Sequence, residues 1–367
     1  METSLLEHDT FIIDGESGDN ETEDGQRVVE VYELMGAGCF VGSFMYKQMS
    51  LYFALPFFAF LLGKAVRYSD TWAIATSRVA AIGGAVITVV VLCVLPVASD
   101  MESVTALVKR IFPVGRGLYE DKVANIWCSI SPAVKLMQLY SKNTLARLCM
   151  VSTLALAAPK CIHLVKNPTA KNFLVTLLNC SLAFFLVSYH VHEKSILLPV
   201  MPASALLLHY PLVSVLVNTY GFIRLGSVSA GGGCDSVDDK IHIICLPFPP
   251  THSIYPLIKR EGSGLYLLAV AVIYLLAVQP LVWSHVDRLG EWSQRATHLL
   301  YLSAFGCVVL IGCDLAIPPP ARLPDLWTLL ITTYSCAHFV VIYLLTLLPD
   351  IPSPVCDGVP ATGKKRI

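Results

Sequence analysis

The chain has 367 residues, of which 55% are hydrophobic and 14% are charged, and its mean hydropathy is +0.63. Soluble domains carry roughly 25% charged residues, so this composition excludes an ordinary soluble protein and indicates one embedded in a lipid bilayer. The formal net charge of -1, without any block of basic residues interleaved with aromatics, predicts no nucleic-acid partner.

The N-terminal residues 1–33 differ from the rest of the chain because they are polar and acidic, with the run DGESGDNETEDGQ. Such a segment buries too little apolar surface to fold, so the sequence predicts a disordered tail. A multi-span membrane domain is predicted over 34–348, and a C-terminal tail over 349–367.

The first hydrophobic segments are uneven when they are compared with the roughly 20 apolar residues that cross a bilayer as a helix. Residues 34–63 contain Lys47 and Gln48, so we expect two short pieces there instead of one span. Residues 79–98 are a clear span. The next segment, 145–165, is weaker because a Pro-Lys pair at positions 159 and 160 breaks it.

Later segments complete the membrane domain. Residues 172–189 form a good span, whereas 196–222 form either one tilted helix or two helices broken near Pro211. A Gly-rich, acidic loop, expected in the cytosol, follows at 226–263. The last three predicted spans are 264–283, 298–317 and 326–348. Because backbone groups in a bilayer must be paired internally, the predicted fold is an all-α polytopic membrane protein with about 8 to 9 transmembrane helices.

Lysine and arginine predict which side of the membrane each loop occupies. They gather before two spans: Lys64, Arg67 and Arg78 before 79–98, and Lys160, Lys166 and Lys171 before 172–189. Loops rich in Lys and Arg stay in the cytosol. The loop 99–144 and the stretch 190–195 are therefore predicted to meet on the opposite, lumenal face.

These two lumenal stretches hold the densest polar chemistry of the chain, in RGLYEDK and VHEK. The candidate site residues are Arg116, Glu120, Asp121, Lys122, His192 and Lys194. Arginine binds phosphate with a bidentate fork, lysine binds it as a point charge, and a helix N-terminus adds free N–H groups. The residues predict an anion site in which the carboxylates orient a cation or accept hydrogen bonds from sugar hydroxyls. A solvated loop is the alternative reading of RGLYEDK.

A metal site at His190, His192 and Glu193 is disfavoured by spacing. Residues two apart on a helix point about 200° away from each other, and the four-residue spacing of a helical zinc pair is absent. The 12 cysteines contain no CxxC pair either. The sequence therefore predicts neither a metal nor a cofactor.

Three long segments carry a resemblance to a known family: YKQMSLYFALPFFAFLLGK, FPVGRGLYEDKVANIWC and VHEKSILLP. They resemble the endoplasmic-reticulum α-1,3-glucosyltransferases that use dolichyl phosphate glucose, a family of GT-C-type membrane proteins. ARLPDLWTLL is similar to a late segment of the same family. The EDKVAN element resembles the branch that adds the first glucose to the lipid-linked nine-mannose oligosaccharide.

The resemblance implies a GT-C-type bundle in the endoplasmic-reticulum membrane and a reaction in N-glycan assembly. Glucose would pass, with inversion and without a metal, from dolichyl phosphate glucose to a mannose 3-hydroxyl of the dolichyl-diphosphate-linked oligosaccharide. The cations implied at the phosphate are His192 and Lys194, with Arg116 and Lys122 as further candidates. Glu120 and Asp121 would position the donor sugar or hold the lumenal loop closed.

The family pattern also implies a general-base aspartate in a first lumenal loop, followed by a segment similar to HPG…DHGHFQYN. Neither has a counterpart here, because the resemblance begins just before Tyr46 and no acidic residue of 1–38 stands in a matching context. We therefore expect that the N-terminal half of the pattern is missing and that this chain is inactive alone. A catalytically incomplete fragment or a non-catalytic remnant is the alternative, and a transporter is less favoured because no inverted repeat is evident.

The C-terminal sequence KKRI places lysines at the third and fourth positions from the end. This pattern resembles a dilysine retrieval signal of the endoplasmic reticulum, which acts only on a cytosolic tail. A cytosolic tail favours the two-helix reading of 196–222.

Overall fold

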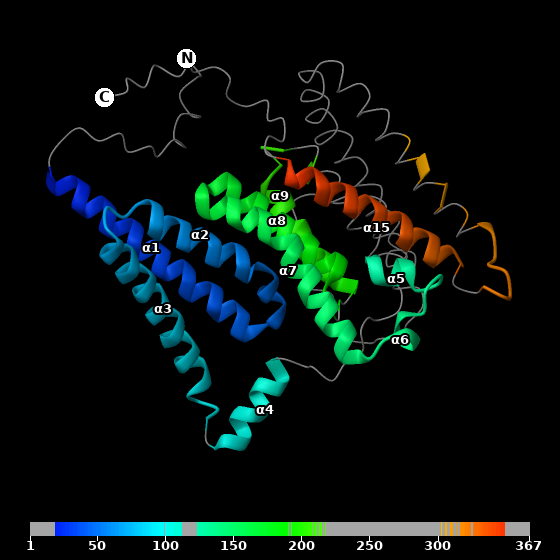
Figure 1. Cartoon of the computed structure of the whole chain (residues 1–367), viewed down its shortest axis with the longest axis horizontal. Helices are drawn as coiled ribbons and strands as arrows, with labels where there is room; N and C mark the ends of the chain where they lie inside the picture. The colour runs from blue at the N-terminus through cyan, green and yellow to red at the C-terminus, as the bar shows by residue number, and fades with distance from the viewer. Residues whose placement is uncertain are drawn as a thin grey trace, which may run out of the picture. The chain divides into compact units, whose positions relative to one another are not determined.

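The structure is a computed structural model that describes residues 19–98, 100–111, 123–189, 191, 193–207, 209–210, 213–214, 217, single positions between 302 and 316, 317–323 and 326–348. Every regular element in that part of the chain is a helix (Figure 1). The chain divides into two compact units: Met1–Ser50 with Tyr68–Phe112, and Leu51–Arg67 with Pro113–Ile367.

In the first unit, α1 (Asp19–Tyr46) packs against α3 (Trp72–Val94), and α4 (Met101–Ile111) follows in the chain. The start of α1 lies inside the stretch for which the sequence predicts a disordered tail, and from Asp19 onward that stretch is helical. Residues 1–18 lie outside the described part.

Polar side chains set the starts of both later helices in this unit. Thr71 caps α3, since its Oγ1 accepts the N–H of Ile74 at 3.4 Å. Asp100 caps α4 in the same way, with the N–H of Ser103 at 2.6 Å from its Oδ1. These hydrogen bonds hold the pKa of the Asp100 carboxyl below its usual range.

The second unit is built from four long helices and several short ones. They are, in chain order, α2 (Ala54–Arg67), α5 (Ile126–Ile130), α6 (Leu136–Leu139), α7 (Lys142–Lys166), α8 (Ala170–Val187), η2 (Glu193–Ile196), α9 (Leu197–Ala205) and α15 (Leu326–Leu347). α8 is central in this arrangement, because it contacts α2, α7, α9 and α15 (Figure 1).

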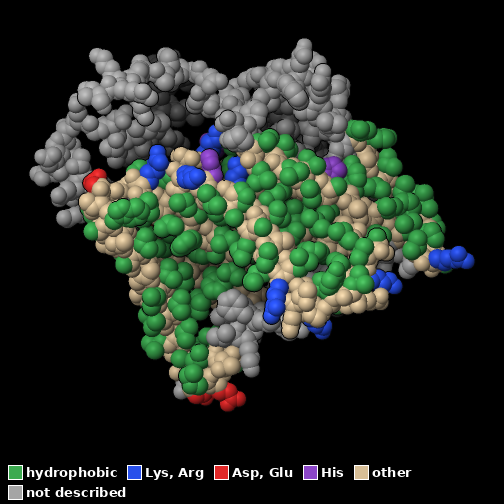
Figure 2. Space-filling view, in the orientation of Figure 1, with side chains coloured by type: hydrophobic (Ala, Val, Ile, Leu, Met, Phe, Trp, Pro, Cys, Tyr) green, Lys and Arg blue, Asp and Glu red, His purple; other side chains and the backbone are tan. Residues whose placement is uncertain are grey.

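Five helices of the described part are long and apolar enough to cross a membrane: Gln48–Arg67, Trp72–Val94, Lys142–Lys166, Ala170–Val187 and Leu329–Leu347. Hydrophobic side chains cover most of the visible described surface, with few charges among them (Figure 2). An apolar outer surface is the one that a bilayer solvates, so the all-helical membrane fold class is confirmed in this part of the chain.

The predicted break within 34–63 is confirmed, because α1 ends at Tyr46 and the short helix η1 (Gln48–Phe53) leads into α2. The second predicted span starts earlier than expected. α3 begins at Trp72, so Arg78 lies inside the helix, where its Nη1 donates to the carbonyl of Tyr68 at 3.1 Å.

The predicted interruption of 145–165 is wrong, because α7 runs unbroken through Pro159. Proline removes one backbone donor, and a transmembrane helix tolerates this loss where neighbouring groups satisfy the freed carbonyl. Lys160 is 8% exposed, and its Nζ lies 3.3 Å from the carbonyl oxygen of Leu348, at the end of α15. The lysine thus has a partner on the neighbouring helix.

The region predicted as 196–222 contains a break, which excludes the single tilted helix. α9 ends at Ala205, and the chain turns at 206–207 and 209. Helical residues resume at 213, so the break lies near Pro211, where the two-helix reading predicts it. The predicted spans 172–189 and 326–348 correspond to α8 and α15. The described positions from 302 to 316 are helical, whereas the segments 226–263, 264–283 and 349–367 lie outside the described residues.

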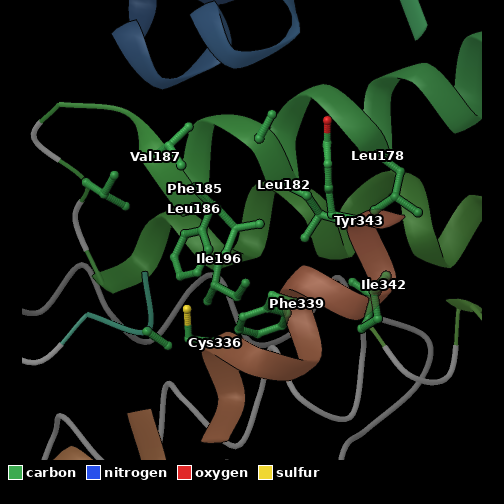
Figure 3. Packing of buried hydrophobic residues seen from close by; sticks show 14 of the residues in the cluster. Leu178, Leu182, Phe185, Leu186, Val187, Ile196, Cys336, Phe339, Ile342 and Tyr343 are labelled. Atoms are coloured by element: carbon green, nitrogen blue, oxygen red, sulfur yellow. The ribbon is translucent and has the colours of Figure 1, made fainter. Parts of the chain in front are cut away.

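The core of the second unit lies between α8 and α15. Phe185 and Phe339 face each other edge to face, with ring centroids 5.5 Å apart at 85° (Figure 3). Leu182, Leu186 and Ile342 are 1% exposed or less around them. Aromatic rings in this geometry gain beyond their buried area, so the pair fixes how α15 lies on α8.

Candidate functional site

The charged residues singled out in the sequence flank the described segments. Arg116, Glu120, Asp121, Lys122 and His192 lie outside the described residues, and so does the side chain of Lys194, although its backbone belongs to η2. The structure describes the chain on both sides of these residues, and these flanking residues are the framework described below.

The described residues that follow the first motif begin directly after Lys122. Val123, Ala124 and Asn125 have no solvent exposure. Asn125 is the N-cap of α5, because its Oδ1 accepts a hydrogen bond from the backbone N–H of Cys128 at 2.8 Å. Asparagine is a preferred N-cap, so the sequence itself sets the point where the motif loop becomes helix.

Trp127 ties α5 to the end of α8. Its ring is 9% exposed, and its Nε1–H donates to the carbonyl oxygen of Val187 at 2.9 Å. Val187 is the last residue of α8, where carbonyl groups have no partner within the helix. The indole therefore satisfies a helix end and fixes α5 beside the chain that enters the second motif.

The second motif is held by buried residues on each side of its charged positions. Val191 and Ile196 are fully buried, and Ser195 is 2% exposed. Val191 and Ile196 belong to the same hydrophobic cluster as Val123 and Ala124. The structure therefore brings the residues that adjoin Lys122 and those that adjoin His192 into one buried cluster.

The opposite end of α8 carries the basic residues. Arg67, in the last turn of α2, donates through Nη1 to the carbonyl of Lys166 at 3.1 Å, and Lys171 lies in the first turn of α8. α8 has 18 residues and is therefore about 27 Å long, close to the roughly 30 Å of a bilayer core. The cation-rich end and the motif end of the second unit thus lie a membrane thickness apart.

Sequence reasoning missed the neutral residues of this framework. Asn125 lies three positions after Lys122, the last charged residue of the first motif, and it carries no charge that would mark it in an apolar chain. An asparagine that precedes an apolar stretch is an N-cap signal, which is how it was detectable. Among the side chains that the structure describes, no group of three His, Cys, Asp or Glu residues could hold a metal ion.

Comparison with known proteins adds independent information. The sequence pattern of the ALG6, ALG8 glycosyltransferase family matches residues 26–228 and 236–345 of the chain. The match includes both motifs and the helices of the second unit, with α15 matched up to residue 345.

Individual relatives are similar over the same region. The chain is 31% identical to the dolichyl pyrophosphate Man9GlcNAc2 α-1,3-glucosyltransferase of Gallus gallus, over 84% of this chain and 59% of that protein. It is 33% identical to a protein of Schizosaccharomyces pombe named as probably having the same activity, over 82% of this chain and 53% of that protein. A similarly named protein of Drosophila melanogaster is 33% identical, over 82% of this chain and 56% of its own length.

The chain therefore spans less than two thirds of the length of these relatives. Its own length is matched over most of its residues, and the match contains the buried framework around both charged motifs. The chain belongs to the ALG6, ALG8 glycosyltransferase family of polytopic membrane proteins.

Proposed function

We propose that this protein acts in the endoplasmic-reticulum membrane as an α-1,3-glucosyltransferase, which transfers the first glucose to the dolichyl-diphosphate-linked nine-mannose oligosaccharide. Dolichyl phosphate glucose is the proposed donor. The observation that carries the proposal is the shared buried cluster, which joins Val123 and Val191, the neighbours of the two charged motifs. Relatives named as Man9GlcNAc2 α-1,3-glucosyltransferases support the choice of acceptor.

The proposed site residues match the chemistry of such a transfer. The acceptor hydroxyl oxygen attacks the anomeric carbon of glucose and loses its proton to a general base, while the bond from that carbon to the phosphate oxygen breaks. The electron pair leaves with dolichyl phosphate, whose charge grows in the transition state. Cations held in place beforehand stabilise that charge, and the proposed cations are Arg116, Lys122, His192 and Lys194.

The carboxylates have a different proposed role. Glu120 and Asp121 accept hydrogen bonds from the hydroxyls of the donor glucose, or keep the loop closed over it. Neither is proposed as the general base, since the family pattern implies an aspartate in another lumenal loop.

The function is tested by the lipid-linked oligosaccharides of cells in which the gene is disrupted. We expect the unglucosylated nine-mannose species to accumulate and the glucosylated species to disappear. Return of the glucosylated species when the intact gene is restored is the control. An unchanged profile contradicts the proposed activity and favours the non-catalytic alternative.

The site is tested by variants of the intact gene, expressed in the disrupted cells. Asp121→Ala and Lys122→Met should lower glucose transfer at limiting donor by tenfold or more, as expected when one preorganised group is lost at a transition state. Lys142→Met is the matched control, because Lys142 is an exposed lysine at the start of α7. Wild-type turnover of Asp121→Ala at limiting donor would remove that residue from the site.

A further inference from the structure

Asn125 has one polar group for which the structure provides no partner. Its backbone N–H donates to the carbonyl of Val123 at 2.9 Å, and its own carbonyl accepts the Ser129 hydroxyl at 2.8 Å. Its Oδ1 accepts the N–H of Cys128. Among the described residues, the side-chain Nδ2 has no hydrogen-bond partner, although Asn125 is completely buried.

The unpartnered atom is the nitrogen and not the oxygen. Amide oxygen and nitrogen are assigned from the hydrogen-bond network, and here the network decides. The N–H of Cys128 needs an acceptor, so the oxygen must face α5. If the amide were turned over, its NH2 group would point at that N–H, two donors would oppose each other, and the cap of α5 would be lost.

A buried donor without a partner is rare in folded proteins and calls for an explanation. The neighbours of Asn125 suggest one. It lies three positions after Lys122, and the residues between them, Val123 and Ala124, share a buried cluster with Val191, the residue before His192. The side-chain NH2 group of Asn125 thus lies next to buried residues that adjoin both of the proposed phosphate-binding motifs.

We propose that Asn125 is a further substrate-binding residue, whose Nδ2–H donates a hydrogen bond to a phosphate oxygen of a dolichyl-linked ligand. The proposal rests on the proposed function for its site and adds a neutral donor to the four proposed cations. Phosphate is the acceptor that the neighbouring charges attract, and a fixed amide donor binds it without the large desolvation that another buried cation requires.

The test measures ligand affinity directly and so does not need catalysis. The full chain is purified in detergent, and the rise in its unfolding temperature is measured during titration with dolichyl phosphate, and separately with dolichyl diphosphate. We expect Asn125→Ser to weaken binding by about 10- to 100-fold, as loss of a hydrogen bond to a charged group does. Weaker binding of dolichyl phosphate alone indicates the donor, and weaker binding of the diphosphate alone indicates the acceptor.

Asn125→Asp separates binding from folding. Aspartate caps helices as well as asparagine does, so α5 keeps its cap while the donor is replaced by a group that repels phosphate. We expect a folded protein with affinity lower than that of Asn125→Ser. Asn179→Ser is the matched control, since Asn179 is equally buried in α8 but its unpartnered atom is the oxygen. The control should keep wild-type affinity.

Several results overturn the proposal. They are wild-type affinity in Asn125→Ser, an equal loss of affinity in Asn179→Ser, failure of Asn125→Asp to fold, and absence of binding of either lipid by the wild-type chain. Glucose transfer in cells provides a separate readout, in which the KM for one lipid substrate rises while the other KM is unchanged. If the oligosaccharide profile contradicts the proposed activity while the binding series behaves as expected, the phosphate site remains and only the reaction is wrong.

Discussion

Trp127 is the residue that joins the two motif-bearing segments most directly. Its indole N–H satisfies the terminal carbonyl of α8, and its ring is packed in the cluster shared by both motifs. Tryptophan in such a place combines a large buried surface with one directed hydrogen bond. Its loss should therefore affect both the stability and the geometry of the site.

We predict that Trp127→Phe lowers the free energy of unfolding by about 1 kcal/mol through the lost hydrogen bond, with a further loss for the smaller ring. Glucose transfer should fall as well, because the end of α8 leads into the second motif. The measurement is thermal unfolding in detergent, together with the oligosaccharide profile of complemented cells.

Trp327→Phe is the comparison for this prediction. Trp327 makes the same type of bond, from Nε1–H to the carbonyl of Ile317 at 2.8 Å, but in an exposed setting. Water can replace an exposed hydrogen bond, so its loss should cost less. Equal losses in the two variants would mean that the Trp127 bond has no special role.

For single residues, the sequence draws attention to the charged residues, which stay a prediction, but not to the neutral, buried residues next to them in the chain. Charge is conspicuous in an apolar chain, which is why RGLYEDK and VHEK stand out. The burial of Val123 and Val191 depends on contacts between residues far apart in the chain, and a single sequence contains no direct record of such contacts.

Among the elements, α2 and α7 approach each other closely at Gly63. A Cβ atom at this position would lie 2.8 Å from the carbonyl oxygen of Val165 and 2.9 Å from its Cα. Both atoms belong to the backbone and cannot rotate away. Small residues at helix contacts in membranes permit this approach, and Ala59 on the same helix is also buried.

We predict that Gly63→Ala separates α2 from α7 and lowers the free energy of unfolding by about 1–3 kcal/mol. Gly84→Ala in α3 is the matched control. A Cβ at Gly84 meets nothing within 4 Å, so the better helix propensity of alanine should leave stability unchanged or raise it by up to about 1 kcal/mol. Similar effects of the two substitutions would contradict the close contact.

A polar pair links α8 to α15 within the membrane domain. Asn179 and Thr346 are both fully buried, and Nδ2 of Asn179 donates to Oγ1 of Thr346 at 2.8 Å. The threonine hydroxyl has a second partner in the carbonyl of Tyr343 at 2.6 Å. The Asn179 amide has no second partner among the described residues, since its Oδ1 makes no hydrogen bond there.

This asymmetry predicts unequal losses from the two sides of the pair. Thr346→Val leaves the whole Asn179 side chain unsatisfied and should cost about 1–3 kcal/mol, more than Asn179→Leu, which leaves the hydroxyl bonded to Tyr343. Unfolding of both single variants and the double variant gives the coupling energy, expected near 0.6 kcal/mol for a membrane hydrogen bond. A larger loss in Asn179→Leu than in Thr346→Val would contradict the argument.

The sequence predicted most of these elements because a bilayer demands long apolar helices. α8 and α15 were found within a few residues of their bounds. The break predicted within α7 is wrong. Local preference alone predicts that a helix ends at a Pro-Lys pair such as Pro159 and Lys160. Lys160 instead contacts Leu348, at the end of α15, and this tertiary contact outweighs the local preference. Leu348 lies 188 positions further along the chain, so the local sequence does not reveal the contact.

For the second unit as a whole, the structure separates two kinds of chemistry along α8. The basic residues around Arg67 and Lys166 gather at one end, and the framework of the two motifs at the other. Positive residues favour the cytosolic face, so the motif end is proposed to be lumenal. This orientation is the one that the proposed reaction requires, because its glycan acceptor and donor sugar would meet outside the cytosol.

The two ends of α7 provide a direct test of this orientation. α7 has 25 residues, about 37 Å, and so exceeds the roughly 30 Å of a bilayer core at both ends. Lys142 at its start and Asn167 just after its end are exposed. We predict that a membrane-impermeant maleimide, added to sealed vesicles with the cytosolic side outward, labels Asn167→Cys and leaves Lys142→Cys unlabelled.

The labelling is done in a chain whose native cysteines are replaced by serine, since Cys39 and Cys93 are exposed and would react. Detergent should then expose Lys142→Cys to the same reagent, which shows that the position is reactive once the membrane is opened. Labelling of Lys142→Cys in intact vesicles would place α5 and both motifs in the cytosol. The proposed site would then face the wrong compartment for a lumenal glucose transfer, even if its phosphate-binding residues were correctly identified.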